Sequence, residues 1–246
     1  MGEFTAGTLL GGRITYRQRR DGHRTGFEPV LLAAAIDAKP GERVLEGGTG
    51  AGAALLCLAA RVPDLTGIGL ERDAALAELA SINFKNNGLG TVSCVQGDVV
   101  KPPFSRDTFD HVFANPPWFD DASTLPPDAR RALAHHASPN LLEDWVAALA
   151  AMLRPRGSLT LILPAATFAQ GVAALRLGGC AGVTLFPLWS RNGQPAKMLI
   201  LSARRGVKSP DRVLPGLVLH DEAGITMAAQ AVLRDGHALS LAGNKV

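Results

Sequence analysis

The sequence predicts an α/β domain with an open, mostly parallel sheet and helices on both of its faces. Three observations predict this fold class. Short apolar runs alternate with helical segments along most of the 246 residues, as expected of repeated β-α units. The run at 43–46 leads into a glycine-rich turn, Gly47-Gly48-Thr49-Gly50-Ala51-Gly52. A later run at 109–114 ends in Asn115-Pro116-Pro117-Trp118. Because such sheets bind ligands at the carboxyl ends of their strands, both turns are expected at one edge.

The expected elements form an alternating β/α series. Strands are expected at 43–46, 65–70, 92–96, 109–114 and 158–163, followed by a hairpin at about 183–189 and 197–203. Helices are expected at 53–61, from the Ser138-Pro139 pair to about Leu153, and at about 166–177 before Gly178-Gly179. Residues 1–27 are expected to form a flexible basic extension, with the folded domain at 28–246.

Length and composition agree with one soluble domain. A chain of 246 residues with 47% hydrophobic residues can bury one full core. No apolar run reaches the length of a membrane span, and residues 1–5 lack the pattern of a signal peptide. Cys57, Cys94 and Cys180 are scattered and odd in number, so we expect reduced thiols and no metal site. These features predict a cytoplasmic protein.

The glycine-rich turn predicts a cofactor site but leaves two cofactors open. A strand, a glycine turn and a helix N-terminus form a cradle in which the backbone approaches a ligand closely. The spacing Gly48-x-Gly50-x-x-Ala53 satisfies the dinucleotide fingerprint, whereas Glu46-x-Gly48-x-Gly50-x-Gly52 equally fits the turn that binds S-adenosylmethionine. Glu71, at the end of the next strand, suits a ribose diol of either cofactor. Asp98, after the third strand, could reach an adenine amino group.

The Asn-Pro-Pro-Trp loop predicts a site that holds a planar amino group. Two prolines stiffen the loop and leave its carbonyls free to accept hydrogen bonds. Asn115 adds a side-chain acceptor, and Trp118 adds a flat apolar face for stacking. This chemistry suits transfer to an NH₂ group on a flat π-system, such as adenine N6 or a carboxamide nitrogen. Read alone, the four residues could also form a rigid turn.

The order of these motifs resembles class I S-adenosylmethionine-dependent methyltransferases that act on amino groups. More narrowly, the chain resembles the bacterial tRNA(Val) adenine-37 N6-methyltransferase family over nearly its whole length. The narrower likeness rests on segments 21–33, 134–136, 194–200, 217–221 and 232–236. The family usually has an aromatic residue at His23 and aspartate at Glu28 and Glu46.

The resemblance implies a seven-stranded Rossmann-like methyltransferase domain with a C-terminal β-hairpin, and S-adenosylmethionine as its cofactor. Catalysis is then expected from Asn115, Pro116, Pro117 and Trp118. The residues expected to bind the cofactor are Glu46, Gly48, Thr49, Gly50, Gly52, Glu71, Asp98, Arg24 and Asn115. The implied reaction is N6-methylation of a tRNA adenine beside the anticodon.

Basic residues at two places predict phosphate contacts with RNA, although solvated loops would give the same pattern. The net charge is only +3, so the positions of the basic residues are more informative than the total charge. Besides Trp118, the residues expected to bind the substrate are Arg17, Arg19, Arg20, Arg191 and Lys197. Three alternatives remain open: a protein glutamine N5-methyltransferase of the release-factor type, a non-catalytic RNA-binding module and a nicotinamide-dependent dehydrogenase. The basic flanks disfavour the glutamine methyltransferase, and the intact Pro-Pro loop and glycine turn disfavour a non-catalytic module. The Pro-Pro loop also disfavours a dehydrogenase, because hydride transfer has no use for it.

Overall fold

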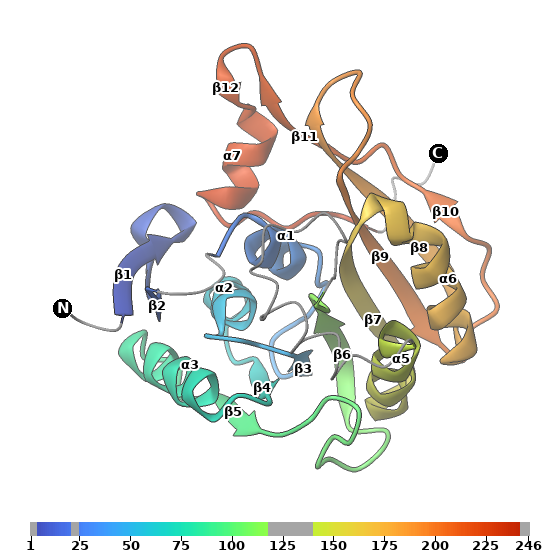
Figure 1. The fold of residues 1–246 in the computed structure, drawn as a ribbon, viewed down its shortest axis with the longest axis horizontal. Coiled ribbons are helices and arrows are strands. Elements are labelled where there is room, and N and C mark those ends of the chain that lie inside the picture. The colour runs from blue at the N-terminus through green and yellow to red at the C-terminus, as the bar shows by residue number, and fades with distance from the viewer. Residues whose placement is uncertain (1–3, 21–24, 118–139, 242–246) are drawn as a thin grey trace, which may run out of the picture.

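The computed structural model describes residues 4–20, 25–117 and 140–241 (Figure 1). Twelve strands are assigned in these ranges: β1 (Phe4–Leu9), β2 (Ile14–Arg19), β3 (Arg43–Gly47), β4 (Thr66–Glu71), β5 (Val92–Gln96), β6 (Phe109–Ala114), β7 (Leu153–Pro164), β8 (Cys180–Arg191), β9 (Met198–Arg205), β10 (Arg212–Val213), β11 (Leu217–Asp221) and β12 (Gly224–Ile225). The α-helices in these ranges are α1 (Glu28–Ala34), α2 (Ala53–Arg61), α3 (Ala74–Asn86), α5 (Leu141–Met152), α6 (Phe168–Leu177) and α7 (Met227–Leu233).

The central sheet contains the seven predicted strands in the order β8-β9-β7-β6-β3-β4-β5. β5, β4, β3, β6 and β7 pair in parallel, and β9 is antiparallel to both of its neighbours. The mostly parallel sheet and its C-terminal hairpin, β8–β9, are therefore confirmed. Three short strands extend the sheet beyond β8 in a way that the sequence did not predict. β11 and β10 both pair with β8, and β12 pairs with β11.

Helices cover both faces of the sheet, as predicted (Figure 1). On one face, α1, α2, α3 and α7 bury their apolar side chains in a core that includes Leu55, Leu56 and Phe84. On the other face, α5 and α6 pack over a second core that includes Val146, Leu149 and Leu175. No helix in the described ranges is long and apolar enough to cross a membrane. The two cores hold the strand ends, and hence the loops after them, in fixed positions.

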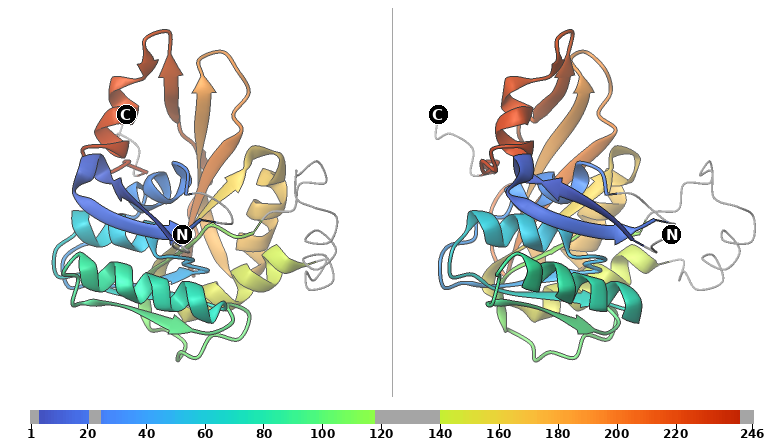
Figure 2. Two further views of the ribbon diagram at one scale, coloured as in Figure 1. Left: turned by 60° about the vertical axis from the view of Figure 1, so that its left-hand side comes forward. Right: turned by 90° about the vertical axis from the view of Figure 1, so that its left-hand side faces the viewer.

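The N-terminal residues differ from the expectation of a flexible extension. β1 and β2 pair antiparallel as a hairpin, which lies beside α3 (Figures 1 and 2). Ile14 and Tyr16 are buried, whereas Thr15 and Arg17 between and after them are exposed. This alternation is the period-2 pattern of a half-buried strand. The expectation was therefore wrong for 4–19, because the basic residues of this segment concealed its apolar face.

Asn83 of α3 and Asn87, which caps the C-terminus of α3, fasten the hairpin. The Asn83 side chain accepts a hydrogen bond from the Arg17 N–H at 3.0 Å and donates one to the Arg17 carbonyl at 2.9 Å. Asn87, one turn later, makes the same pair of bonds to Thr15, at 2.9 and 2.8 Å. Side chains four residues apart share a helix face, so two carboxamides can pair with alternate residues of one strand edge.

Candidate functional site

The loops after β3, β4 and β6 meet at one edge of the sheet. β3 lies between β4 and β6 and is parallel to both. Gly47 at the end of β3 is paired with Leu70 on one side and with Ala114 on the other. The glycine turn, the end of β4 and Asn115 therefore start from adjacent positions, as the sequence predicted.

The turn after β3 requires glycine for two reasons. Gly48, Gly50 and Gly52 have φ of 68°, 55° and 88°, in the left-handed region that glycine adopts most easily. A Cβ on Gly48 would lie 2.6 Å from the Trp145 ring, and one on Gly52 would lie 2.6 Å from the Phe84 ring. A Cβ on Gly50 meets no described atom within 4 Å. The turn is thus packed at both ends and open in its middle.

Glu46 stabilises the turn from inside. Its side chain is buried, and Oε2 accepts hydrogen bonds from the Thr49 hydroxyl at 2.6 Å and from the Leu55 N–H at 3.1 Å. Burial raises the pKa of the Glu46 carboxyl to about 8, although the bonds from Thr49 and Leu55 oppose the shift and the charge of Glu71 adds to it. Glu46 therefore joins the end of β3 to its turn and to the first turn of α2.

The two acids predicted at the next strand ends differ in their contacts. Glu71 is half-buried, and its Oε2 accepts a hydrogen bond from the Gly50 N–H at 2.9 Å. Asp98 is exposed, and its Oδ1 accepts from the N–H of Val100 at 2.9 Å, two residues along. Glu71 thus touches the open part of the glycine turn, whereas Asp98 caps its own loop.

A cavity of about 370 Å³ lies against the turn, within the usual size range of small-molecule sites. Glu46, Gly48, Thr49 and Gly50 line one part of it, and Asn115 lines another. The remaining walls come from the N-terminal hairpin, from Thr25 and the start of α1, from the glycine turn and from α2 and α3. They are Tyr16, Gln18, Arg19, Thr25, Pro29, Ala51, Ala53, Ala54 and Leu76. The structure thus gathers five predicted cofactor residues at one cavity.

Curated relatives identify the family. An Actinobacillus pleuropneumoniae protein named tRNA1(Val) (adenine(37)-N6)-methyltransferase is 30% identical over 73% of this chain and 75% of its own length. This chain belongs to the tRNA1(Val) (adenine(37)-N6)-methyltransferase family. A Bacteroides thetaiotaomicron protein of the same name is 33% identical, and the match spans only 60% of that protein. The profile of a methyltransferase domain matches residues 44–138.

A solved structure supports the fold independently. The crystal structure of a protein described as a predicted O-methyltransferase, from Agrobacterium tumefaciens, superposes with a TM-score of 0.73. It covers 87% of this chain and 98% of its own, at 22% identity. At that identity the likeness concerns the fold alone. Open α/β sheets of this kind bind ligands at the carboxyl ends of their strands.

Sequence reasoning missed the part of the site that the hairpin supplies. The Tyr16 hydroxyl is within hydrogen-bonding distance of Thr25 Oγ1, at 3.0 Å, and Gln18 Oε1 accepts from the Thr25 N–H at 3.0 Å. Asn83 is buried, and besides Arg17 its amide donates to the Ala51 carbonyl at 2.9 Å. Asn83 therefore connects the hairpin to the glycine turn. The alternation of β2 was the signal available in the sequence.

The predicted substrate residues divide between two cavities. Arg19 lines the cavity at the glycine turn, whereas Arg17 and Arg20 are exposed outside its lining. Arg191 and Lys197 line a separate cavity of about 530 Å³, together with His220. Because β9 is antiparallel to both β7 and β8, this second cavity lies at the same edge of the sheet as Asn115.

The remaining predicted residues of the Pro-Pro loop and the N-terminal segment are only partly described. Pro116 is buried and Pro117 is exposed. Trp118 and Arg24 lie outside the described residues, so their expected roles stay predictions. No cluster of three or more His, Cys, Asp or Glu side chains suited to a metal occurs in ranges 4–20, 25–117 and 140–241.

Proposed function

We propose that this protein methylates N6 of an adenine in tRNA, beside the anticodon, with S-adenosylmethionine as methyl donor. One observation carries the proposal. Asn115, the first residue of the Asn-Pro-Pro-Trp motif, lines the same cavity as Glu46 and the glycine turn. An amino group held by Asn115 would therefore lie beside a cofactor held by the turn. The names of the relatives give the target as adenine 37 of tRNA1(Val) in those proteins.

The residues around the turn fit the proposed cofactor. Gly50 leaves open space where a side chain would stand, and its N–H already contacts the Glu71 carboxylate. A carboxylate in this position accepts hydrogen bonds from a ribose diol. Gly48, Thr49 and Gly52 shape the turn, and Glu46 holds it; Asp98 and Arg24 are proposed to complete the site. The bound cofactor supplies an electrophilic methyl group on its sulfonium.

Asn115 and Pro116 orient the nucleophile. The side-chain oxygen of Asn115 and the carbonyl of Pro116 accept the two hydrogens of the amino group. Both bonds draw the nitrogen lone pair out of conjugation with the ring and aim it at the methyl carbon. Alignment of reacting atoms about 3–3.5 Å apart supplies much of the rate in such a transfer. A strong general base is unnecessary, because the proton can leave after the new bond has formed. Pro117 stiffens the loop, and Trp118 is proposed to stack on the base.

Basic side chains on both sides of Asn115 would hold the RNA backbone. Arg17, Arg19 and Arg20 lie on or beside β2, and Arg191 and Lys197 lie at the second cavity of the same edge. Arg191 Nη1 also donates to the Asp221 carbonyl at 3.1 Å, which restricts its side chain. An anticodon-loop base is already nearly unpaired, so its entry into the site costs little unstacking energy.

The direct test is incubation with labelled S-adenosylmethionine and either tRNA transcripts or release factor. N6-methyladenosine beside the anticodon is expected, and label in a glutamine of release factor would instead indicate the protein substrate.

A second experiment tests the proposed RNA contacts with a variant in which Arg17 and Arg20 are replaced by glutamine. This double variant spares Arg19, which lines the cavity at the glycine turn. This double variant should bind tRNA with a salt slope smaller by about 0.7 per lost contact, with unchanged cofactor affinity. The matched control is Lys85→Gln, an exposed cation on α3; an equal loss in the control would contradict the assignment.

A further inference from the structure

A second polar cavity opens at the opposite edge of the sheet from Asn115. It has a volume of about 750 Å³ and lies where β6 and β7 begin and β9 ends. Its other walls come from the segment between α1 and β3, from the first part of β8, from Arg212 of β10 and from the segment 238–241. Methyl transfer, at the carboxyl ends of the strands, makes no use of this space. The side chains that line it are therefore not explained by the proposed reaction.

Hydroxyl groups cover a sheet face that is elsewhere apolar. Thr160 and Ser202 are cross-strand partners on β7 and β9, with their oxygens 2.9 Å apart. Ser158 lies two residues before Thr160, and its Oγ is 2.7 Å from Nδ1 of His111. Farther along the same face, Ile162 and Ile200 are part of the apolar core. The change from isoleucine to serine and threonine along the same two strands keeps this cavity polar.

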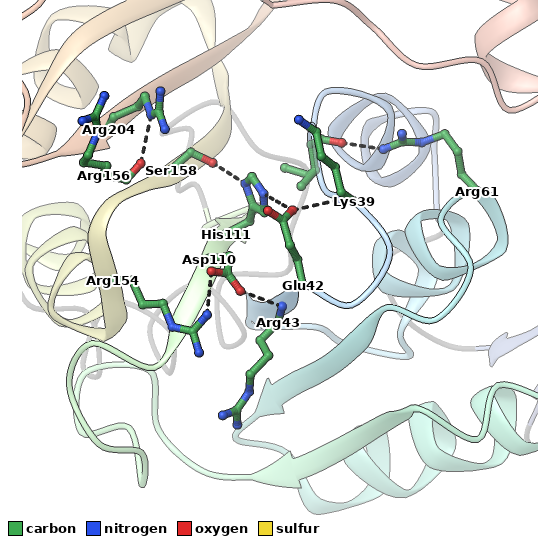
Figure 3. A network of polar contacts seen from close by, with 11 residues as sticks. Lys39, Glu42, Arg43, Arg61, Asp110, His111, Arg154, Arg156, Ser158 and Arg204 are labelled. Carbon is green, nitrogen blue, oxygen red and sulfur yellow. Dashed lines mark hydrogen bonds and ion pairs between the residues drawn. The ribbon is translucent and has the colours of Figure 1, made fainter.

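Two of the three acids that line the cavity, Glu42 and Asp110, have partners (Figure 3), and the third is Asp37. Glu42 Oε2 is 2.9 Å from His111 Nε2 and accepts the Lys39 N–H at 2.8 Å. Asp110 pairs with Arg154 at 2.7 Å and accepts the Arg43 N–H at 2.9 Å. These carboxylates are thus engaged on one side of the network.

Two arginines on the other side lack such neutralisation. Arg204 Nε donates to the Arg156 carbonyl at 2.9 Å, which brings the two residues together (Figure 3). Within the described ranges, neither guanidinium forms an ion pair with a carboxylate. Both residues are exposed and line the cavity. The planar donors of a guanidinium group that has no carboxylate partner match phosphate oxygens.

The backbone at Arg156 is strained in a way that favours a role for this side chain. Its φ is 68°, in the left-handed region where a residue other than glycine is disfavoured. Glycine would adopt this conformation without strain, and the next residue, Gly157, is itself closely packed against the Asp110 carbonyl. A strained, non-glycine backbone position beside a polar cavity is consistent with a functional role for its side chain.

We propose that this cavity binds a small phosphate-bearing molecule. The guanidinium groups of Arg156 and Arg204 would hold the phosphate, and the hydroxyls of Ser158 and Ser202 would contact it or the group that it carries. Lys39, on the wall beside Glu42, adds a further positive charge. The volume suits a sugar phosphate or a pyrophosphate. The site is independent of the proposed methyl transfer.

The test is calorimetry with the full chain at constant ionic strength, using inorganic phosphate, pyrophosphate and ribose 5-phosphate as probes. Saturable binding of at least one probe is expected. Arg204→Gln should weaken it about ten-fold or more, since a hydrogen bond to a charged group contributes at least one factor of ten. Arg156→Gly should weaken it similarly without loss of thermal stability, because glycine relieves the positive φ. Arg106→Gln, an exposed arginine outside the cavity lining, is the matched control.

Four outcomes would overturn the proposal. The first is no saturable binding of any probe by the wild-type chain. The second is equal binding by wild type and Arg204→Gln. The third is displacement of the probe by S-adenosylmethionine, which would assign it to the methyl-transfer cavity. The fourth is stoichiometric displacement by tRNA together with weaker tRNA binding by Arg204→Gln, which would make this surface an RNA contact. Loss of methylation in any variant would bear on the proposed function and not on this site.

Discussion

The two edges of the central sheet carry polar groups in different ways. At the carboxyl edge, the groups follow the strands in tight turns, and a cavity exposes Gly50 and Asn115. At the amino edge, Asp110 and His111 lie within the first residues of β6 and bind neighbouring side chains directly. A turn after a strand presents backbone donors to the adjacent cavity, whereas Asp110 and His111 use their side chains to bind groups of adjacent strands and loops. One edge thus offers backbone groups of a tight turn, and the other a network of charged side chains.

One carboxylate from each edge shows the electrostatic difference. Burial raises the pKa of Glu46 to about 8. At Asp110 partial burial also opposes ionisation, but the Arg43 N–H and the Arg154 guanidinium outweigh it and lower the pKa. The carboxyl edge therefore favours a protonated acid that holds a turn together, and the amino edge favours an ionised acid in a salt bridge.

The largest expected effect comes from Asn115→Ala. The variant removes one acceptor for the amino group but keeps both prolines, so substrate and cofactor should still bind within a few-fold. Turnover should fall by about 10²–10³, the scale for one preorganised hydrogen-bonding partner, with little change in the Michaelis constant. Steady-state kinetics on tRNA measure both quantities, and Asn115→Asp should keep part of the activity. If Asn115→Ala turned over tRNA at the wild-type rate, the assignment of the active site to the carboxyl edge would be wrong.

Alanine substitutions at two glycines of the same turn should affect different properties, stability at Gly52 and cofactor affinity at Gly50. Gly52→Ala should unfold more easily than Gly50→Ala by about 1–3 kcal/mol, because only its Cβ overpacks a neighbour, the Phe84 ring. Gly50→Ala should fold but lose cofactor affinity, since its methyl group would project toward the cavity. Urea unfolding without cofactor and calorimetry with S-adenosylmethionine separate the two results. Equal stabilities would mean that the turn is not packed at Gly52 as described.

The pH dependence of stability should reveal Glu46. Its folded-state pKa of about 8 is above the ordinary value of 4.5, so the folded state holds a proton that the unfolded state releases between these values. This contribution is fully present below about pH 4.5 and is lost as the pH rises through about 8, with a slope of at most about 1.4 kcal/mol per pH unit. Urea unfolding of the cofactor-free chain from pH 5 to about 8 measures it. Glu46→Gln should make the free energy of unfolding less dependent on pH over this range. An unchanged dependence would show that the pKa of Glu46 is not raised.

The smallest effect is expected at the other edge. Asp110→Asn should cost about 1 kcal/mol or less, because the pair with Arg154 is partly exposed. The lowered pKa of Asp110 contributes stability at neutral pH that is lost as the pH falls through the ordinary value of 3.8 and below, opposite in direction to Glu46. Unfolding at pH 7 and in acid, with methyl transfer measured in parallel, tests this. A loss of methyl transfer comparable to that of Asn115→Ala would mean that the edges are not independent.

The sequence by itself determined the fold class and the order of groups along the carboxyl edge. Apolar periodicity located β3, β4, β5 and β6, and the glycine and proline residues located the turns after β3 and β6. These features depend on residues close together in the chain. A turn that needs φ of 68° at Gly48, or a loop stiffened by two prolines, is specified by the residues in it.

Only the tertiary structure decided what lies around those turns. Asn83 fastens the hairpin beside the glycine turn, and its partner Arg17 is 66 residues away in the chain. The cavity at the amino edge likewise requires Ser158 to meet His111, 47 residues away, and Arg204 to meet Arg156, 48 residues away. Local patterns cannot specify such pairs, because the packing of both cores fixes which strand edges and helix faces adjoin. Side-chain amides, hydroxyls and guanidinium groups acquire their partners only after that packing is complete.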